Sequence, residues 1–549
     1  MSGATLSTRD RHTTARGTSL VGVGPLVRFL LRRDRIKLPA WTGGLGLFVV
    51  YLSAALPNVA ETEEELRSAT QLFADPVGRL LIGPGYGFDD PTFERFVANG
   101  YGLYFALIAA LMSILLVVRH TRLEEQTGRA ELIRANVVGR STQLTATVVL
   151  AVITNLVAAA AVSATMIGVA GFAPAGSVVF AAGLGATGLA FAGVTTITVQ
   201  LSQYSRAAAG AAGGVLGAAF LIRAGGDMAA EGGTALSWFS PLAWAQQTAP
   251  YVLDRWWPLA LTLGFAIATT TVGFFLSGRR DLGASLVATR PGPHEATPRL
   301  GTPIGLAARL QRGNILGWGA ALVVSGLAYG AYTDALTTAF DDLPEVFLEL
   351  FGGSDDLVAG YLAYMAVFMA WLAGAYTVTA MQSLRSEETS GRAEPVLATP
   401  VSRTDWLASN LAVTATAIVV LLAAAGLATG LGAAIVTGDG THIGEMLLAH
   451  LNQVPAVWVV LGIAALLYGI LPRAVPAAWV LIAFGLIAGT FGPLLDLPER
   501  VLELSPFAHP AAVPLEALRP LPLLALTAIA TAGALIGLLT FHRRDLDAT

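Results

Sequence analysis

Twelve apolar runs, each about as long as a bilayer is thick, dominate this chain of 549 residues. A helix needs about 20 apolar residues to cross the hydrocarbon core of a membrane. The runs lie near residues 41–60, 98–118, 144–170, 175–200, 207–223, 256–278, 315–333, 357–382, 406–436, 446–471, 475–495 and 520–541. Only 13 % of the residues are charged, about half the fraction that a soluble globule carries. The pattern predicts an all-α polytopic membrane protein with 12 transmembrane helices.

A ten-residue stretch occurs twice. Residues 122–131 read RLEEQTGRAE and residues 385–394 read RSEETSGRAE, with seven identical positions. Arg-Arg-Asp-Leu ends each set of six runs, at 279–282 and 543–546, and a Ser-Pro pair precedes each sixth run. Matches at one nearly constant offset indicate a duplication. Six spans repeated in one orientation predict two parallel six-helix repeats, a pseudo-dimer about an axis along the membrane normal.

The duplication divides the chain into four expected segments. These are a disordered cytoplasmic tail over 1–19, a first six-helix permease repeat over 20–282, a cytoplasmic linker over 283–303 and a second repeat over 304–549. The tail lacks the apolar core and small-residue cleavage site of a signal peptide. Residues 20–37 mix apolar residues with arginines, which predicts a basic amphipathic helix on the membrane surface.

Charge places the two ends of the spans. The connection between spans 1 and 2 is acidic, and the one between spans 7 and 8 carries six Asp and Glu from Asp341 to Asp356 with no Lys or Arg. The arginines gather in the alternate connections and at the ends of both repeats. By the positive-inside rule the arginine-rich side is cytoplasmic. Both termini are therefore expected in the cytoplasm.

Several kinds of chemistry are excluded by residue type. The chain has no cysteine, and its single lysine, Lys37, lies between Ile36 and Leu38. A P-loop needs Gly-Lys-Ser/Thr, so the chain is not itself a P-loop ATPase. The histidines show no metal-ligand spacing, and we assign no metal and no catalytic residue. Arg223, Asp227, Asp254, Arg255 and His450 are all expected near span ends, which disfavours ion coupling through buried charges.

The repeated Glu-Glu-x-x-Gly-Arg-Ala-Glu element has a plain interpretation as topogenic charge. Arginines alone would serve that purpose, because carboxylates contribute little to the positive-inside rule. Three carboxylates and a Gly-Arg-Ala triplet in both copies favour a short helix that docks on a partner. Their carboxylates would face a basic surface, and reversing Glu125 or Glu388 to Arg is expected to leave folding intact but to uncouple transport.

On these residues the chain resembles the membrane subunit of ABC-2-type exporters, specifically the fused two-repeat permeases of actinobacteria grouped with tetronasin-type polyketide-antibiotic exporters. The resemblance rests on EEQTGRAELIRANVVGR at 124–140, EETSGRAEPVLATPVSR at 387–403 and the Ser-Pro elements before spans 6 and 12. It implies coupling segments at 119–143 and 383–404, a connecting helix at 20–38 and short outer helices at 224–255 and 496–518. The residues it implies for coupling are Glu124, Glu125, Gly128, Arg129, Glu131, Arg140, Glu387, Glu388, Gly391, Arg392, Glu394 and Arg403.

The resemblance implies a multi-pass transport subunit of a bacterial plasma membrane and not an enzyme. It would work with two copies of a separately encoded ABC ATPase, which binds ATP and Mg, while this chain holds no cofactor. The expected cargo is a small amphipathic or lipophilic compound such as a drug, an antibiotic or a lipid, with membrane lipids around the spans and no nucleic acid. Phe105, Phe368 and Trp371 are candidates for the cargo path, although aromatic belts explain many such residues.

Two other functions remain open at this point. A major-facilitator-type carrier also duplicates six spans in parallel, but its connection between spans 2 and 3 is usually short and basic. A lipid-linked glycosyltransferase would use outer-loop carboxylates such as Asp89 and Asp90. Duplication of the whole six-span unit does not follow from that reaction.

Overall fold

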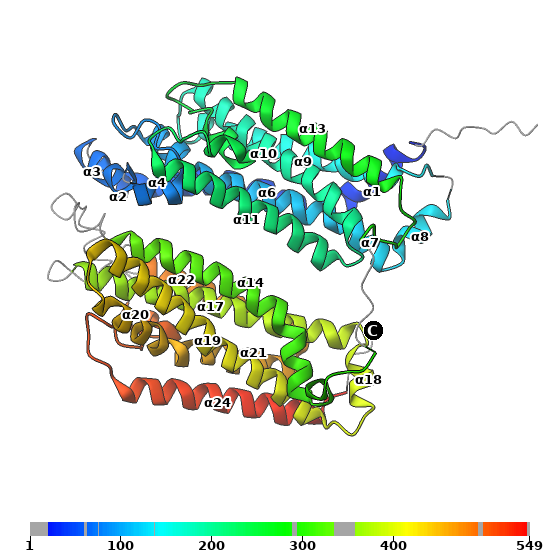
Figure 1. Cartoon of the computed structure of the whole chain (residues 1–549), viewed down its shortest axis with the longest axis vertical. Helices are drawn as coiled ribbons and strands as arrows, with labels where there is room; N and C mark the ends of the chain where they lie inside the picture. Colours follow the sequence, from blue (N-terminus) through cyan, green and yellow to red (C-terminus); the bar gives the residue numbers. More distant parts are fainter. Residues whose placement is uncertain are drawn as a thin grey trace, which may run out of the picture. The chain divides into compact units, whose positions relative to one another are not determined.

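The computed structural model describes residues 20–59, 63–74, 76–136, 138–287, 294–333, 357–491 and 498–545. The expected tail over 1–19 and the acidic stretch from Asp341 to Asp356 lie outside these residues. Helices are the only regular secondary structure in the described chain (Figure 1). The chain separates into two compact units, Met1–Arg290 and Pro291–Thr549. We describe each unit by itself.

Unit 1 consists of long apolar helices joined by short helical segments. In chain order the elements are α1 (Val23–Arg33), α2 (Lys37–Val59), α3 (Glu63–Ala74), α4 (Pro76–Ile82), α5 (Phe93–Arg95), a π-helical turn (Phe96–Gly100), α6 (Gly102–His120), α7 (Arg122–Gln126), α8 (Arg129–Arg134), α9 (Thr142–Gly168), α10 (Pro174–Leu201), α11 (Ser205–Ala229), a 3-10 turn (Ser237–Phe239), α12 (Pro241–Gln246) and α13 (Trp257–Ser277).

Unit 2 follows the same style of construction. Its elements are a 3-10 turn (Pro298–Gly301), α14 (Pro303–Ala331), α17 (Leu357–Thr389), α18 (Ala393–Leu397), α19 (Arg403–Thr437), α20 (Thr441–Asn452), α21 (Val454–Ile470), a 3-10 helix (Pro472–Ala478), α22 (Trp479–Phe491), α23 (Glu499–Leu502), a 3-10 turn (Pro506–Ala508) and α24 (Pro520–Arg543).

Eleven helices in the described chain are long and apolar enough to cross a membrane, or twelve if a bent pair is counted as one more span. The bent pair is Val23–Arg33 with Lys37–Ala54, which meet at 65°. Each of the twelve apolar runs of the sequence overlaps one of these helices. The chain is therefore a multi-pass membrane protein, as expected, and its first span begins after a sharp bend.

The expected basic amphipathic helix is α1. It buries Leu26, Val27 and Leu30 on one face, while Arg28 and Arg32 on the other face are exposed. The bend to α2 follows at Asp34, which is itself buried. The sequence pattern therefore located this helix within three residues at its start.

The repeated Ser-Pro pairs are helix caps. The hydroxyl of Ser240 accepts a hydrogen bond from the backbone N–H of Leu242, and Ser505 accepts one from Phe507. In each case proline follows at the first helical position, where its missing N–H costs nothing. The pairs start the short helices that precede the last long helix of each unit.

The last long helix of each unit packs closely against another helix, α13 against α10 and α24 against α21. Glycines lie at these contacts. A Cβ on Gly273 of α13 would lie against Thr196 of α10, and one on Gly537 of α24 would lie 2.4 Å from the carbonyl oxygen of Ala465 of α21. Without Cβ atoms these helices approach closely and gain dispersion contacts across apolar faces. The ends of α13 and α24 are thereby held beside α10 and α21.

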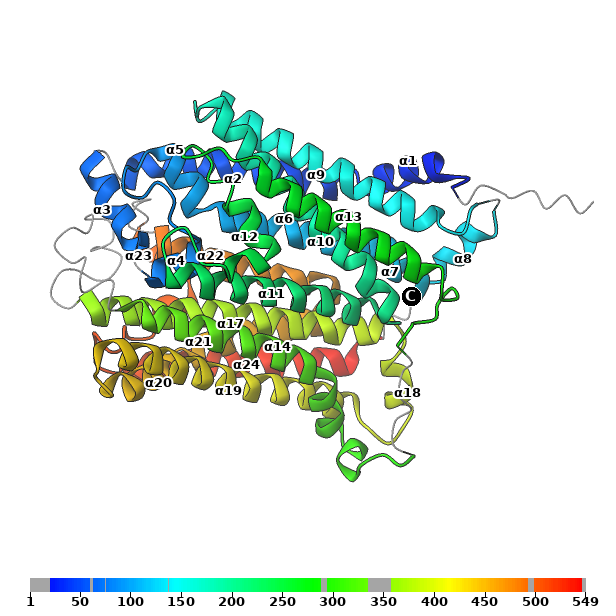
Figure 2. The same cartoon turned by 45° about the horizontal axis from the view of Figure 1, so that its top comes forward.

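In unit 1, α1, α7 and α8 lie at one end of the bundle and α3 and α4 lie at the other (Figures 1 and 2). In unit 2, α18 and α20 likewise lie at opposite ends. We call the end of each unit that carries α7 and α8, or α18, its basic end. Arg122 and Arg280 lie there in unit 1, and Arg403 and Arg544 lie there in unit 2.

One expected position is wrong. His450 lies at the junction of α20 and α21, inside the candidate span Thr441–Ile470, and it is fully buried. Its ring Nδ1 donates to the carbonyl oxygen of Met446 at 2.8 Å. The apolar run starts later in the sequence than the helix does, so His450 seemed closer to an end than it is. Arg223 and Asp227, by contrast, lie near the end of α11 as expected.

Candidate functional site

The repeated stretch breaks a helix at the basic end of each unit. We call residues 122–140 the first loop segment and residues 385–403 the second. Gly128 separates α7 from α8 with φ 72°, and Gly391 separates α17 from α18 with φ 70°. Glycine adopts this left-handed conformation without strain and commonly ends helices. The repeated glycine is therefore required by the backbone.

The first repeated carboxylate pairs with the arginine of the Gly-Arg-Ala triplet. Glu124 lies 3.1 Å from Arg129 Nε, and Glu387 lies 2.8 Å from Arg392 Nε. Both nitrogens at the Arg392 fork donate to Glu387, which raises the pKa of the Arg392 guanidinium. The alanine of each triplet is buried under the short helix. The motif thus folds back on itself in both units.

The second repeated carboxylate reaches an arginine just beyond the last long helix of its unit. Glu125 pairs with Arg280 at 2.6 Å, and Glu388 pairs with Arg544 at 2.7 Å. The carboxylate side chains are 6 % and 2 % exposed. Charge-assisted hydrogen bonds of this length are strong in a site shielded from water. In unit 1 the loop segment is therefore joined to the chain that follows α13. In unit 2 it is joined to the residue that follows α24.

The backbone carbonyl oxygens of Arg280 and Arg544 in turn accept hydrogen bonds from the loop segments. Arg140 donates to the carbonyl oxygen of Arg280 at 3.3 Å and to that of Gly278 at 2.9 Å. Arg403 donates to the carbonyl oxygen of Arg544. We call each set of two contacts a loop clamp: Glu125 and Arg140 hold Arg280, and Glu388 and Arg403 hold Arg544. The contacts come from corresponding positions of both repeated stretches.

The two clamps differ in their surroundings. In unit 1 the buried Arg122 adds a second positive charge on Glu125 at 2.8 Å and donates to the carbonyl oxygen of Val199. In unit 2 the hydroxyl of Tyr468 donates to Glu388 at 2.5 Å, and the Arg544 guanidinium lies over the ring of Tyr468. The first clamp is rich in charge and the second is built around an aromatic ring.

Unit 1 also ties its loop segment to the bend after α1. Arg33 pairs with Glu124 at 2.6 Å. Asp34 pairs with Arg119 at 3.0 Å and with His120 Nε2 at 2.7 Å. The carboxylate of Asp34 is buried, so these partners offset its loss of water. The sequence analysis did not predict this cluster. Asp34 and Arg119 are 85 residues apart, and no local pattern indicates that they are in contact.

The third repeated carboxylate is the one that faces outward. Glu131 in α8 and Glu394 in α18 are exposed, and so are Leu132 and Pro395 beside them. Glu124, Glu125, Glu387 and Glu388 each have an ion-pair partner within the unit. The contact of the motif with an ATPase stays a prediction. Reversing Glu125 or Glu388 would also set a buried arginine against arginine, so the expectation that folding survives is withdrawn.

The candidate cargo-path residues lie in packed aromatic clusters. Phe105 is fully buried between Phe48 and Phe180. Phe368 and Trp371 are in edge contact, and Trp371 lines a cavity of about 240 Å³ with Phe507. The indole nitrogen of Trp371 is buried and has no hydrogen-bond partner among the described residues. Phe105 lines a cavity of only about 20 Å³, so of the three Trp371 lines the larger space.

The long apolar helices define a multi-pass helical membrane protein. A family model described as the C-terminal domain of the multidrug efflux system permease Rv1217c matches residues 25–276 and 300–542. The chain belongs to this family of multidrug efflux permeases. It is also similar to the multidrug efflux system permease protein Rv1217c of Mycobacterium tuberculosis (strain ATCC 25618 / H37Rv), with 37 % identity over 536 residues, 97 % of this chain and 96 % of that protein.

Proposed function

We propose that this chain is the transmembrane subunit of an ATP-driven ABC-2-type exporter that moves amphipathic or lipophilic compounds out of the cell. Its two units would form one pathway as a pseudo-dimer of parallel six-helix repeats, with both termini in the cytoplasm. The segments would be those expected from the sequence, with repeats over 20–282 and 304–549. A separately encoded ATPase in two copies would bind ATP and Mg and supply the free energy. The tetronasin-type cargo class remains part of this proposal.

The occurrence of the same loop clamp in both units carries the proposal. A topogenic loop needs only positive charge, and neither a left-handed glycine nor a buried carboxylate adds to that. A loop that transmits movement from a partner protein must be rigid, and it must be joined to the helices that it moves. Each clamp supplies both properties, since it joins the loop segment to the end of the last long helix.

Movement would pass through this chain in three steps. A partner docks on the exposed faces of α8 and α18, where Glu131 and Glu394 offer carboxylates. Closure of the two partner copies shifts the loop segments, and the clamps carry the shift to Arg280 and Arg544. Close packing of α13 on α10 and of α24 on α21 then passes it into each bundle. The protein alternates between two states whose populations the nucleotide biases.

The multidrug efflux naming of the relative supports the cargo class, and the apolar spans suit it. A lipophilic compound needs no buried counter-charge along its path. Trp371 could donate its unpaired indole N–H to a cargo acceptor at the 240 Å³ cavity. Phe105 would shape the packed wall of unit 1 and would not contact cargo directly.

The class is tested by gentle purification from the native membrane. We expect a P-loop ATPase to accompany the chain at two copies per chain, and export to stop when ATP is withdrawn. Transport that collapses with an uncoupler while ATP is held constant would instead identify an ion-coupled carrier. Activity that is lost on changing Asp89 or Asp90 to Asn, with no ATPase bound, would identify a glycosyltransferase.

The docking faces are tested with Glu131→Arg and Glu394→Arg. Because both side chains are exposed, the variants should insert and melt like the parent protein. We expect them to lose ATPase binding or to uncouple ATP hydrolysis from export. The matched control is Glu295→Arg, an exposed carboxylate of the linker. Normal coupled export by both loop variants would reject the docking assignment.

A further inference from the structure

Unit 2 contains a cavity of about 240 Å³ beside Trp371. It lies between α17, α22 and the short helical segments that follow α22, and residues of all three line it. An engineered protein cavity of about 150 Å³ is large enough to bind benzene. The cavity in unit 2 is therefore large enough for an aromatic ring that carries a small substituent.

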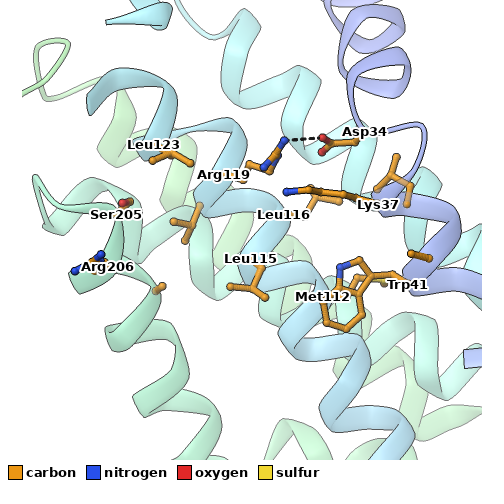
Figure 3. A pocket seen from close by; sticks show the side chains of 14 residues that line it. Asp34, Lys37, Trp41, Met112, Leu115, Leu116, Arg119, Leu123, Ser205 and Arg206 are labelled. Carbon is orange, nitrogen blue, oxygen red and sulfur yellow. Dashed lines mark hydrogen bonds and ion pairs between the residues drawn. The ribbon is translucent and has the colours of Figure 1, made fainter. Parts of the chain in front are cut away.

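None of the described residues that line this cavity is charged. Its polar groups are the indole N–H of Trp371 and the hydroxyl of Ser505, and its apolar walls come from Val367, Ala488, Leu502, Phe507 and Ala508. The cavity of about 720 Å³ in unit 1, between α2, α6 and α11, differs because Asp34, Lys37 and Arg119 line it (Figure 3). An ion that enters an uncharged, apolar site loses its water without compensation. The cavity of unit 2 therefore suits a neutral compound.

Neighbouring aromatic rings hold the indole of Trp371 in one orientation. Tyr364, Phe368 and Phe507 each lie edge-on to it, with ring centroids 6.1, 6.1 and 6.4 Å away. Aromatic pairs favour this edge-to-face arrangement. The hydroxyl of Tyr364 is also hydrogen-bonded to that of Thr490 in α22, at 2.9 Å. A side chain that is already fixed loses little conformational freedom when it binds a ligand.

The indole N–H of Trp371 is a donor without an acceptor among the described residues. The side chain is only 3 % exposed, and its nitrogen is shielded from water. Other indoles of the chain have carbonyl partners, since Trp244 donates to Trp238 at 2.7 Å and Trp458 donates to Ala415 at 3.2 Å. Buried polar groups in proteins are nearly always hydrogen-bonded. The unpaired donor at the cavity therefore indicates a ligand that accepts a hydrogen bond.

Two glycines of α22 leave space at the edge of this indole. A Cβ on Gly485 would lie 3.1 Å from Nε1 of Trp371, and a Cβ on Gly489 would lie 2.6 Å from Cζ2. Both glycines also line the cavity. Because residue 485 has no side chain, the space beside the indole nitrogen is open to an acceptor atom.

We propose that this cavity binds a neutral aromatic compound with a carbonyl or ether oxygen that accepts a hydrogen bond from Trp371. The ring of the compound would lie against Val367, Leu502 and Phe507, and its oxygen would lie beside Gly485. Removal of apolar surface from water favours entry of the ring. The single hydrogen bond fixes its orientation and selects compounds that carry an acceptor.

This inference names a class of compound for unit 2, and it rests on the proposed function only where it treats that compound as cargo. Binding itself requires neither ATP nor a partner protein. Failure to bind would reject the site and would leave the proposed exporter unchanged. A compound that binds here but is not exported in the presence of ATP and the ATPase would count against the proposed function, while the binding site would stand.

The test uses the full chain in detergent, with any copurifying partner. The probes are 4-fluoroacetophenone and 4-fluoro-α-methylstyrene, which have the same shape but carry a C=O and a C=CH₂ group respectively. Fluorine NMR separates protein-bound from micelle-bound probe, and the melting temperature is followed in parallel. We expect the ketone to bind about five- to tenfold more tightly than the alkene. Equal affinities, or no binding of either probe, would overturn the proposal.

The first variant removes only the donor. Trp371→Phe retains an aromatic ring, so it should still bind the alkene but should lose the preference for the ketone. Trp479→Phe is the matched control, because Trp479 is 37 % exposed at the start of α22 and does not line the cavity. Equal weakening of both probes in Trp371→Phe would show that the indole only fills space. Loss of the preference in Trp479→Phe as well would likewise reject the site.

The second variant fills the space beside the donor. Gly485→Ala should weaken binding of the ketone more than binding of the alkene, because its methyl group lies next to the indole nitrogen. Gly317→Ala in α14 is the control, since nothing lies within 4 Å of the position of its Cβ. An unchanged preference in Gly485→Ala would place the oxygen elsewhere and reject the hydrogen bond.

A charged probe tests the class of ligand. Phenyltrimethylammonium has a ring of similar size and a positive charge that aromatic faces can attract. We expect it to bind more weakly than 4-fluoroacetophenone and to leave the bound ketone in place at equal concentration. Tighter binding of the cation, with dependence on Trp371, would assign the cavity to cationic compounds and overturn the proposal.

Discussion

Buried carboxylates at the basic ends obtain their partners from distant parts of the sequence. Glu388 is 2 % exposed and meets Arg544, which lies 156 residues later. Removing water from a charge costs several kcal/mol, which an ion pair with added hydrogen bonds can offset. Tyr468 supplies such a bond to Glu388. The pair is therefore a feature whose loss has a measurable cost.

We predict that Glu388→Ala and Arg544→Ala each destabilise the protein by about 3–5 kcal/mol, because each leaves the other charge buried without its partner. The double variant should lose less than the sum of the two, as expected of residues in direct contact. Melting temperatures of the purified protein measure all three. Glu387→Ala is the control, since its partner Arg392 is 54 % exposed and the expected change is at most about 1 kcal/mol. Additive losses would show that the clamp contributes no coupling.

A second buried pair lies at the other end of unit 1. Arg223 and Asp227, both fully buried, are 3.1 Å apart, and the hydroxyl of Ser237 donates to Asp227 at 2.6 Å. Asp227→Asn should lower the melting temperature, since it leaves the charge of Arg223 without its counter-charge. Glu231→Gln, at an exposed position nearby, is the control and should leave the melting temperature unchanged. A parent-like melting temperature for Asp227→Asn would mean that Arg223 is satisfied by backbone carbonyls alone.

At the scale of elements, small residues decide which helices touch. A Cβ on Gly462 of α21 would lie 2.4 Å from the carbonyl oxygen of Ala530 of α24, so the two backbones are in contact there. Composition alone could not select this glycine among the 60 in the chain. The contact matters because the clamp residue Arg544 directly follows α24.

We predict that Gly462→Val separates α21 from α24, lowers the melting temperature and reduces transport. The reason is that the valine side chain occupies the space of the Ala530 backbone. Gly444→Val is the control, because nothing lies within 4 Å of the position of its Cβ in α20. Thermal unfolding and export assays compare the two. Equal melting temperatures and equal export by the two variants would show that the close contact of α21 with α24 does not matter for stability or transport.

At the scale of the whole molecule, the asymmetry of charge predicts which ends of the units face the cytoplasm. Arginines gather at the basic end of each unit, where the loop clamps lie. Positive residues are retained on the cytoplasmic side during insertion. Because the chain contains no cysteine, one introduced cysteine reports its own side of the membrane.

We predict that Glu131→Cys and Glu394→Cys, in cells that express this chain alone, are protected from a membrane-impermeant maleimide. Glu231→Cys and Glu503→Cys, which are exposed in the loops beyond α11 and α23, should be labelled. Permeabilised cells, in which all four positions must react, provide the control. Labelling of the first two positions in intact cells would invert the topology and reject cytoplasmic docking of an ATPase.

The sequence by itself determined what local pattern can encode. Run length specified the long apolar helices, since the thickness of a bilayer fixes the length of a span. The sequence repeats Gly128 as Gly391, and it repeats the Ser-Pro pair. The glycines allow a left-handed backbone conformation, and the Ser-Pro pairs cap short helices. The repeated stretch also predicted a transport permease, which the family match confirms, while its finer assignment to ABC-2-type exporters stays a proposal.

Only the tertiary structure decided which repeated charges face inward. Glu125 and Glu131 are alike in type and lie in one segment, yet the first is held by Arg280 and the second is exposed. That difference depends on the packing of α13 on α10, which brings residues 155 positions apart within 2.6 Å. The cavity beside Lys37 likewise needs three helices to meet. Long-range contacts of this kind depend on how whole helices pack, and no local spacing encodes them.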